Sequence, residues 1–257
     1  MQEYNREKTS LRDLQLRMLD MLKFIDDICK KNNISYWLSS GTLLGAIRHK
    51  GFIPWDDDCD IEMLREDYDK LIKILKNDPN GKYVIQTTET DRDYLYPFAK
   101  LRDLSTILVC DENIYDSNKY RGAFIDIFPL ESYPFWILRF CAGIQYKILF
   151  PLYAFLKGNK AAQVLKYFVV NFLFPLIRFL SKKKRDYYTH TLGVPFYLKR
   201  RYKMDIYPLI SIEFENYNFP SPNDYDSYLK NLYGNYNKIP PINERHTHNF
   251  NNIIFIK

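Results

Sequence analysis

A dense run of acidic residues leads directly into a short apolar segment in the first quarter of the chain. Four aspartates lie within five positions: Asp56, Asp57, Asp58 and Asp60. Their carboxylates repel one another at neutral pH, so a folded domain tolerates them mainly in solvent or around a cation. Residues i and i+2 of a strand share one face, so a strand here would let Asp58 and Asp60 bind one ion side by side. A solvated acidic loop is the alternative.

The segment before the aspartates predicts an anion-binding turn. Gly41 and Thr42 open a short helix that we expect over 42–48. Free backbone N–H groups at a helix start, together with a hydroxyl, bind phosphate well. Because the chain returns directly from this helix to the acidic strand, phosphate and cation would lie close together. The combination indicates metal-assisted phosphoryl or nucleotidyl transfer.

These motifs resemble a known family. Gly41-Thr42 followed by Asp58-Cys59-Asp60-Ile61 is similar to the nucleotidyltransferase-fold signature of a Gly-Gly/Ser turn and a later Asp-x-Asp. The stretch 41–61, GTLLGAIRHKGFIPWDDDCDI, resembles the LicD family of phosphocholine transferases, to which fukutin-related proteins are distantly similar. Blocks at 98–103, 122–130 and 222–229 agree with this resemblance. It covers about residues 10 to 248 and is weakest over 132–200.

The resemblance implies an α+β fold, with a small mixed nucleotidyltransferase-like sheet flanked by helices. It also implies Mg²⁺-dependent transfer of a phospho-alcohol group, with Mn²⁺ as a possible substitute. The group would be phosphocholine, the donor CDP-choline or a related CDP-alcohol, and the acceptor a sugar hydroxyl of a cell-surface glycan or its lipid-linked precursor. Two other functions stay open: a nucleotidyltransferase acting on a small molecule, and a non-catalytic scaffold at the membrane periphery.

Asp126 completes the expected catalytic and metal-binding set with Asp58 and Asp60. It is a lone carboxylate in Phe-Ile-Asp-Ile-Phe, and a buried charge costs several kcal/mol unless it is paired or bound to a metal. We expect a third metal ligand or a general base, the alternative being an ion pair with a neighbouring arginine. Oxygen ligands and a phosphate substrate favour Mg²⁺ over zinc.

A second set of residues is expected to bind the donor phosphates: Gly41, Thr42, Arg48, Lys50, Lys100 and Arg102. For the basic ones, exposed ion pairs are the alternative. Trp55 is expected to stack on the base, to meet a quaternary ammonium, or to pack in the core. Asp56 and Asp57 would cap the loop or hold a second ion, and His246 and His248 would contact substrate rather than metal.

The net charge of +6 is concentrated in one segment. Ten basic residues and no acidic ones lie over 132–185, which leaves 27 of the 37 basic residues against all 31 acidic ones. Because these basic residues alternate with aromatic and apolar ones, an anionic membrane surface is a better partner than nucleic acid. The uncharged runs 148–156 and 167–177, interrupted by Pro151, Asn171 and Pro175, fall short of the ~20 residues that span a bilayer. We expect a helical hairpin at the membrane interface; two ordinary helices packed on the core are the alternative.

The expected organisation has three parts: a catalytic core over 1–131, the basic apolar helical insertion over 132–200, and a C-terminal segment over 201–257 that completes the core and the acceptor site. Polar residues at the N-terminus argue against a signal peptide. Four scattered cysteines suit reduced thiols, so we expect a cytoplasmic protein, peripheral on the inner face of the membrane. Periodicity predicts helices over 10–31, 65–76 and 224–232, and strands over 35–39, 59–63, 83–87, 98–102, 106–110 and 124–128.

Overall fold

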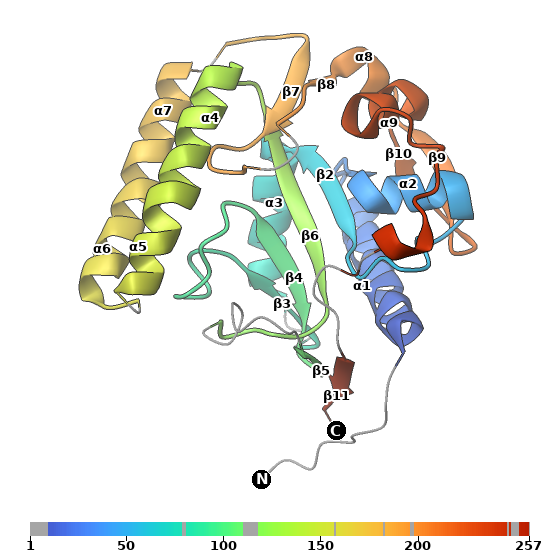
Figure 1. The fold of residues 1–257 in the computed structure, drawn as a ribbon, viewed down its shortest axis with the longest axis horizontal. Helices are drawn as coiled ribbons and strands as arrows, with labels where there is room; N and C mark the ends of the chain where they lie inside the picture. The colour runs from blue at the N-terminus through green and yellow to red at the C-terminus, as the bar shows by residue number, and fades with distance from the viewer. Residues whose placement is uncertain are drawn as a thin grey trace.

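The computed structural model describes residues 10–78, 81–109, 118–156, 158–181, 183–195, 198–245, 247 and 252–256. A mixed sheet runs through its centre, with a helical hairpin along one side and a helical layer along the other (Figure 1). The arrangement confirms the predicted α+β class. In spatial order the main strands are β1 (Trp37–Leu38), β2 (Asp60–Leu64), β6 (Phe124–Glu131), β4 (Ala99–Asp103) and β3 (Tyr83–Gln86).

Two amphipathic helices, α1 (Leu11–Lys31) and α3 (Arg65–Lys76), pack on one face of the sheet. Helix α1 begins after Ser10, whose side chain and that of Asp13 form a capping box, which satisfies two of the free N–H groups at the helix start. The buried stripe of α1 enters the main core together with that of α3. Both helices match the predicted ranges.

The register of the central strands sets up the site. Strands β2 and β6 are parallel, with Asp60 opposite Asp126. Strands β6 and β4 are antiparallel, with Lys100 opposite the same Asp126. Paired residues on adjacent strands share a face of the sheet, so three ionisable side chains lie level across β2, β6 and β4.

Strand β6 is longer than predicted, because Pro129 was expected to end it and does not. Pairing with β4 stops at Ile127, and pairing with β7 (Tyr187–His190) starts at Leu130. Pro129 falls in the interval between these partners, where a missing N–H is tolerated. Strand β7 also pairs with β8 (Arg201–Tyr202), which extends this end of the sheet.

The hairpin has two arms. Each arm is a continuous helix that contains a π-helical segment between two α-helical ones. The first arm is α4 (Phe135–Gly143), η2 (Ile144–Leu149) and α5 (Phe150–Phe155); the second is α6 (Lys160–Phe168), η3 (Val169–Leu173) and α7 (Phe174–Ser181). Pro151 and Pro175 interrupt the uncharged runs of the sequence, but the helical arms continue through both prolines. Each proline follows a wide π turn, which makes room for its ring and absorbs the missing hydrogen bond. The second arm, Lys160–Ser181, is consequently long and apolar enough to cross a membrane by length and composition, contrary to the expectation from its uncharged runs.

The C-terminal segment folds back over the start of the chain. It contains α8 (Lys203–Ile206), the hairpin of β9 (Ile210–Phe214) and β10 (Tyr217–Ser221), α9 (Tyr225–Tyr233), η4 (Ile242–Glu244) and β11 (Asn252–Phe255), which pairs with β5 (Thr106–Val109). Helix α9 confirms the prediction for 224–232. The β9–β10 hairpin was not predicted, because its turn uses Glu215 and Asn216 at positive φ in place of a glycine. Phe214 and Phe219 carry it into the main core.

Candidate active site

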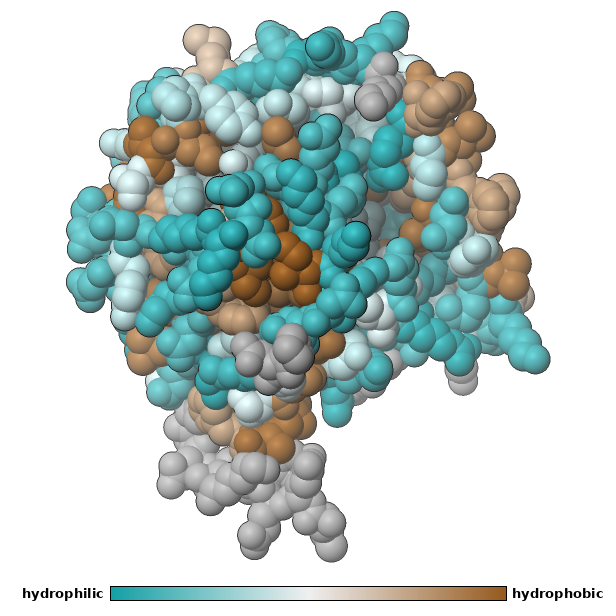
Figure 2. Space-filling view, turned by 180° about the vertical axis from the view of Figure 1, so that it is seen from behind, coloured by the Kyte–Doolittle hydropathy of each residue, from teal (hydrophilic) through white to brown (hydrophobic). Residues whose placement is uncertain are grey.

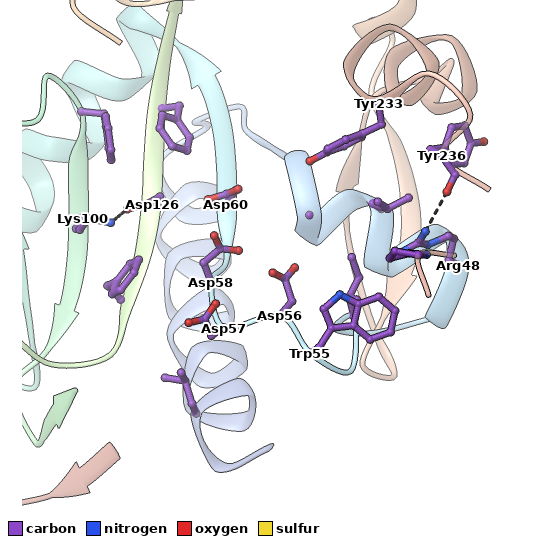
Figure 3. Close-up of a pocket in the computed structure, with 18 of the residues that line it drawn as sticks. Arg48, Trp55, Asp56, Asp57, Asp58, Asp60, Lys100, Asp126, Tyr233 and Tyr236 are labelled. Carbon is purple, nitrogen blue, oxygen red and sulfur yellow. Dashed lines mark hydrogen bonds and ion pairs between the residues drawn. The ribbon is translucent and has the colours of Figure 1, made fainter. Parts of the chain in front are cut away.

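A cavity of about 690 Å³ opens between the sheet and α2 (Ser40–His49). One wall comes from β2, β4, β6 and the loop before β2, and the opposite wall comes from α2 and the segment around the end of α9 (Figure 3). The polar and charged residues that line it are Arg48, Asp56, Asp57, Asp58, Asp60, Lys100, Asp126, Asn235 and Lys238. The structure thus brings the three expected catalytic aspartates to one cavity.

Asp126 and Lys100 form a close buried ion pair on this cavity wall, with Nζ donating to Oδ1 at 2.5 Å. Figure 3 shows the Asp126 carboxylate turned toward Lys100, whereas those of Asp58 and Asp60 are turned toward α2. Strand β2 begins at Asp60, so Asp58 lies in the preceding loop and not in the strand as predicted. Cys59 and Ile61 are buried.

The carboxylates outnumber the cations around Asp60, and its pKa reflects this. Burial, then repulsion from Asp58 and Asp126, raises the pKa of Asp60 well above its usual range. Burial also raises the pKa of Asp126, although Lys100 opposes the shift. In turn, burial lowers the pKa of the Lys100 ammonium, with Asp126 opposing. A bound cation would relieve the repulsion at Asp60.

The donor set fits a hard divalent cation that shares its coordination with substrate. Asp58 and Asp60 offer carboxylate oxygens to the same cavity. Within the described residues, no three His, Cys, Asp or Glu side chains form a completed ligand set. Mg²⁺ in phosphate-binding sites is held by one or two carboxylates plus substrate phosphates and water, so two carboxylates suffice.

At the start of α2, Gly41 and Thr42 occupy different environments. Gly41 lines the cavity, and a Cβ there would lie 2.6 Å from Asp56 Oδ2, so a glycine lets this carboxylate approach the helix. Thr42 is buried, and its hydroxyl accepts a hydrogen bond from the backbone N–H of Asp60 at 2.8 Å. The Thr42 side chain therefore positions the first residue of β2, whereas the sequence predicted that its hydroxyl contacts phosphate.

Of the four basic residues expected at the phosphates, the structure brings two to the cavity. Lys100 and Arg48 line it, and Arg48 Nη1 donates to the backbone carbonyl of Tyr236 at 3.0 Å. Lys50 is exposed beyond the end of α2 and is not among the lining residues. Arg102 is buried one pleat from Lys100, where its guanidinium donates to Gln86 and to the Gly122 carbonyl, so it does not line the cavity either.

Two clusters of aromatic residues, which were not predicted as site residues, complete the lining of the cavity. Tyr96, Phe98, Phe124 and Phe128 line the sheet side, and Tyr233 and Tyr236 line the α9 side. The Lys100 ammonium lies 3.7 Å from the centroid of the Phe124 ring, a cation–π distance. The alternation of Phe98, Lys100 and Arg102 at the start of β4 was the available signal for the sheet side. The α9 side depends on a long-range return of the chain, which has no local signal.

A second missed cluster lies deeper, two residues beyond Asp60 on β2. Glu62 is fully buried and accepts from Arg201 Nε at 3.0 Å, contacts His190 Nε2 at 2.8 Å, and accepts from the Tyr228 hydroxyl. Burial alone would raise the pKa of Glu62, but Arg201 and His190 outweigh it and hold that pKa well below its usual range. The Tyr228 hydroxyl also lies 3.2 Å from Ser39 Oγ, so the cluster joins β2 to the start of α2.

The other residues singled out from the sequence lie in several places. Trp55 lines the cavity and also packs against the main core, and the Arg245 guanidinium lies 4.4 Å from its ring centroid. Cys29, Cys59 and Cys141 are buried free thiols, as expected. His246, His248 and Cys110 lie outside the described residues.

The chain is similar to known proteins over most of its length. Residues 33–147, which span α2, the aspartates and β6, match the family model described as LicD/FKTN/FKRP, nucleotidyltransferase domain. The lipopolysaccharide cholinephosphotransferase LicD of Haemophilus influenzae is 30% identical over 94% of this chain and 97% of its own length. Human ribitol 5-phosphate transferase FKRP is 40% identical over 45 residues, which cover 18% of this chain and 9% of that protein. The near full-length match to LicD shows that the chain belongs to the LicD family.

Proposed function

We propose that this protein transfers a phospho-alcohol group, phosphocholine in the first instance, from a CDP-linked donor to a sugar hydroxyl of a cell-surface glycan or its lipid-linked precursor. Two relatives carry names that support this chemistry: a lipopolysaccharide cholinephosphotransferase and a ribitol 5-phosphate transferase. Both names describe the transfer of a phosphorylated alcohol. The first relative matches nearly the whole chain, so it weighs more in the choice of alcohol.

One observation carries the proposal. Asp60, Asp126 and Lys100 lie level on three adjacent strands and face one cavity, with Asp58 beside them. These acids converge on a cavity that a substrate can enter. Burial and repulsion from Asp58 and Asp126 raise the pKa of Asp60. Such perturbed groups in a cavity are typical of functional sites.

Asp58 and Asp60 are the residues that would hold Mg²⁺ or Mn²⁺, on the cavity side that faces α2. When bound, the ion would neutralise the negative charge of the donor diphosphate. Arg48 would add a positive charge on the opposite wall.

The transfer itself is a displacement at the phosphorus that carries the alcohol. The acceptor hydroxyl oxygen forms the new P–O bond, the bond to the bridging diphosphate oxygen breaks, and CMP leaves with that oxygen. Asp126 is the candidate base for the hydroxyl proton, because burial raises its pKa and so strengthens it as a base. Lys100 orients its carboxylate. Alternatively, Asp126 would be the third ligand of the metal.

The aromatic residues suit a cationic alcohol. Trp55, Tyr233 and Tyr236 line the wall around Arg48, and aromatic faces bind quaternary ammonium groups. The choice of choline over glycerol or ribitol rests on the near full-length relative.

A donor screen tests the proposal. Purified protein with Mg²⁺ and a lipid-linked glycan acceptor should release CMP from CDP-choline faster than from CDP-ethanolamine, CDP-glycerol or CDP-ribitol. Parallel reactions with CTP and phosphocholine test the nucleotidyltransferase alternative, in which diphosphate is released. Absence of CMP release from every CDP-alcohol, with diphosphate release from CTP, would overturn the transferase proposal.

A further inference from the structure

The outer face of the helical hairpin (Phe135–Ser181) is a large apolar surface with no partner among the described residues. On the first arm the exposed apolar residues are separated by four, eight, four and three positions. On the second arm they recur every three to four positions, apart from two adjacent pairs, so each arm presents one stripe. Figure 2, seen from behind, shows hydrophobic side chains gathered along the edge where the hairpin lies. The residues are Trp136, Phe140, Ile148, Leu152 and Phe155, then Val164, Tyr167, Phe168, Phe172, Leu176, Phe179 and Leu180.

The inner face of the hairpin is anchored to the core by polar contacts. Gln145 donates to the Leu95 carbonyl at 2.5 Å, Lys166 donates to the Arg92 carbonyl at 2.6 Å, and Arg178 pairs with Glu131 at 2.7 Å. These contacts keep both arms alongside the domain, although only 22% of the most apolar stretch of the second arm is buried. A spanning hairpin would have to break them and take Lys166 and Arg178 into hydrocarbon, which is costly.

The charge around this surface identifies the partner. Arg139, Lys147 and Lys160 are exposed on the same hairpin, and no acidic residue occurs over 132–185. A second copy of the chain would bring the same basic residues together with no acids to compensate, because a two-fold interface pairs a surface with itself. An anionic lipid surface satisfies both the apolar stripes and the basic residues.

We propose that this outer face, called here the hairpin face, docks on an anionic bilayer with both arms lying in the interface. Its inner side reaches the cavity, because the ring of Phe150 lies 5.5 Å from that of Tyr96, which lines the cavity wall. Docking would therefore hold the cavity beside the membrane. That this serves a lipid-linked acceptor rests on the proposed function; the docking itself does not.

Vesicle flotation tests the docking without any activity measurement. The full chain is floated with phosphatidylcholine vesicles that contain or lack phosphatidylglycerol, at low and high salt. The triple variant Trp136→Ser/Phe155→Ser/Phe179→Ser removes side chains that are 70%, 82% and 78% exposed. We expect its partitioning to fall by about tenfold or more, because each large apolar side chain contributes strongly to interfacial binding.

Matched controls keep the test decisive. The variant Met204→Ser/Ile242→Ser removes apolar side chains that are 79% and 80% exposed elsewhere, and its partitioning should be unchanged. The variant Arg139→Gln/Lys147→Gln should lose about fivefold per residue on anionic vesicles only. Thermal unfolding verifies that each variant is folded. Equal flotation of the triple variant and wild type would overturn the proposal, as would a salt-stable dimer in solution that the triple variant abolishes while no vesicle binding occurs.

Discussion

Two buried carboxylates lie two residues apart on β2 and have opposite electrostatic environments. Asp60 faces the cavity among other acids, and burial with that repulsion raises its pKa. Glu62 lies in the interior with Arg201, His190 and Tyr228, which outweigh its burial and lower its pKa. Within the described part of the chain, the side chain of Asp60 has no ion pair, whereas Glu62 pairs with Arg201 and contacts His190.

The difference separates structure from function along one strand. Glu62 and its partners join β2 to the start of α2, and so fix the two walls of the cavity relative to each other. Asp60 is held at the end of that strand at a cost in stability, because its charged form is disfavoured in the folded protein. We infer that one carboxylate contributes to stability and the other to chemistry.

Replacing Asp60 should have the largest effect. In Asp60→Asn, CMP release should fall by about 10²- to 10³-fold, the loss typical of a group that stabilises transition-state charge. The same variant should unfold at a higher temperature than wild type in metal-free buffer at neutral pH, because the repulsion is relieved. Initial rates and thermal melts measure both effects. Asp20→Asn, an exposed change on α1, should alter neither. Full activity in Asp60→Asn would contradict a role of Asp60 in the chemistry.

Replacing Glu62 should have the reverse pattern. Glu62→Ala removes the carboxylate that balances the buried charge of Arg201, which costs about 3–5 kcal/mol in the free energy of unfolding. Denaturant unfolding measures this loss. The fraction that remains folded should still bind donor, since Glu62 does not line the cavity. A loss below about 1 kcal/mol, the usual value for an exposed pair, would show that the cluster is not structural.

The pH dependence should distinguish the two carboxylates. Folding lowers the pKa of Glu62 from its ordinary value of 4.5, so its contribution is present above that pH and is lost as the pH falls through the folded value. Folding raises the pKa of Asp60 from 3.8, so its ionisation destabilises the protein as the pH rises above that value. The loss of unfolding free energy caused by Glu62→Ala should therefore shrink in acid. The amount by which wild type is less stable than Asp60→Asn should shrink in acid as well. A difference that is constant from acid to neutral pH would contradict either assignment.

A smaller effect is expected at Gly41. The Cβ of Gly41→Ala would lie 2.6 Å from Asp56 Oδ2, so this carboxylate must move. Because the contact is with the end of a side chain, stability should change little. Displacement of a cavity carboxylate should lower CMP release by about ten- to hundredfold. Gly143→Ala, where nothing lies within 4 Å of the added Cβ, is the matched control. Equal rates of CMP release for the two variants would show that the position of Asp56 does not affect activity.

The sequence predicted the elements that have strong local patterns. The period of α1 and α3, and the apolar alternation around Asp126 and Lys100, led to correct ranges within a few residues. The three aspartates that stood out in the sequence, Asp58, Asp60 and Asp126, all line one cavity. Local patterns were sufficient here because each of these aspartates lies in or directly beside a strand of the central sheet.

What could not be predicted depends on contacts between distant segments. The partners of Glu62 come from β7, β8 and α9, and no residue near Glu62 in the sequence indicates them. Arg102 was expected in the site because it shares a face with Lys100, but Gln86 and the Gly122 carbonyl bind it elsewhere. Pro129 was expected to end its strand, yet it falls in the interval between the pairing of β6 with β4 and its pairing with β7.

Calorimetric titration of CDP-choline, with and without Mg²⁺, tests the central claim most directly. If Asp58 and Asp60 hold a cation that binds the donor diphosphate, wild-type protein should bind CDP-choline more tightly when Mg²⁺ is present, and Asp60→Asn should lose that increment. Equal affinity with and without Mg²⁺ in the wild type, or an unchanged increment in Asp60→Asn, would contradict the claim.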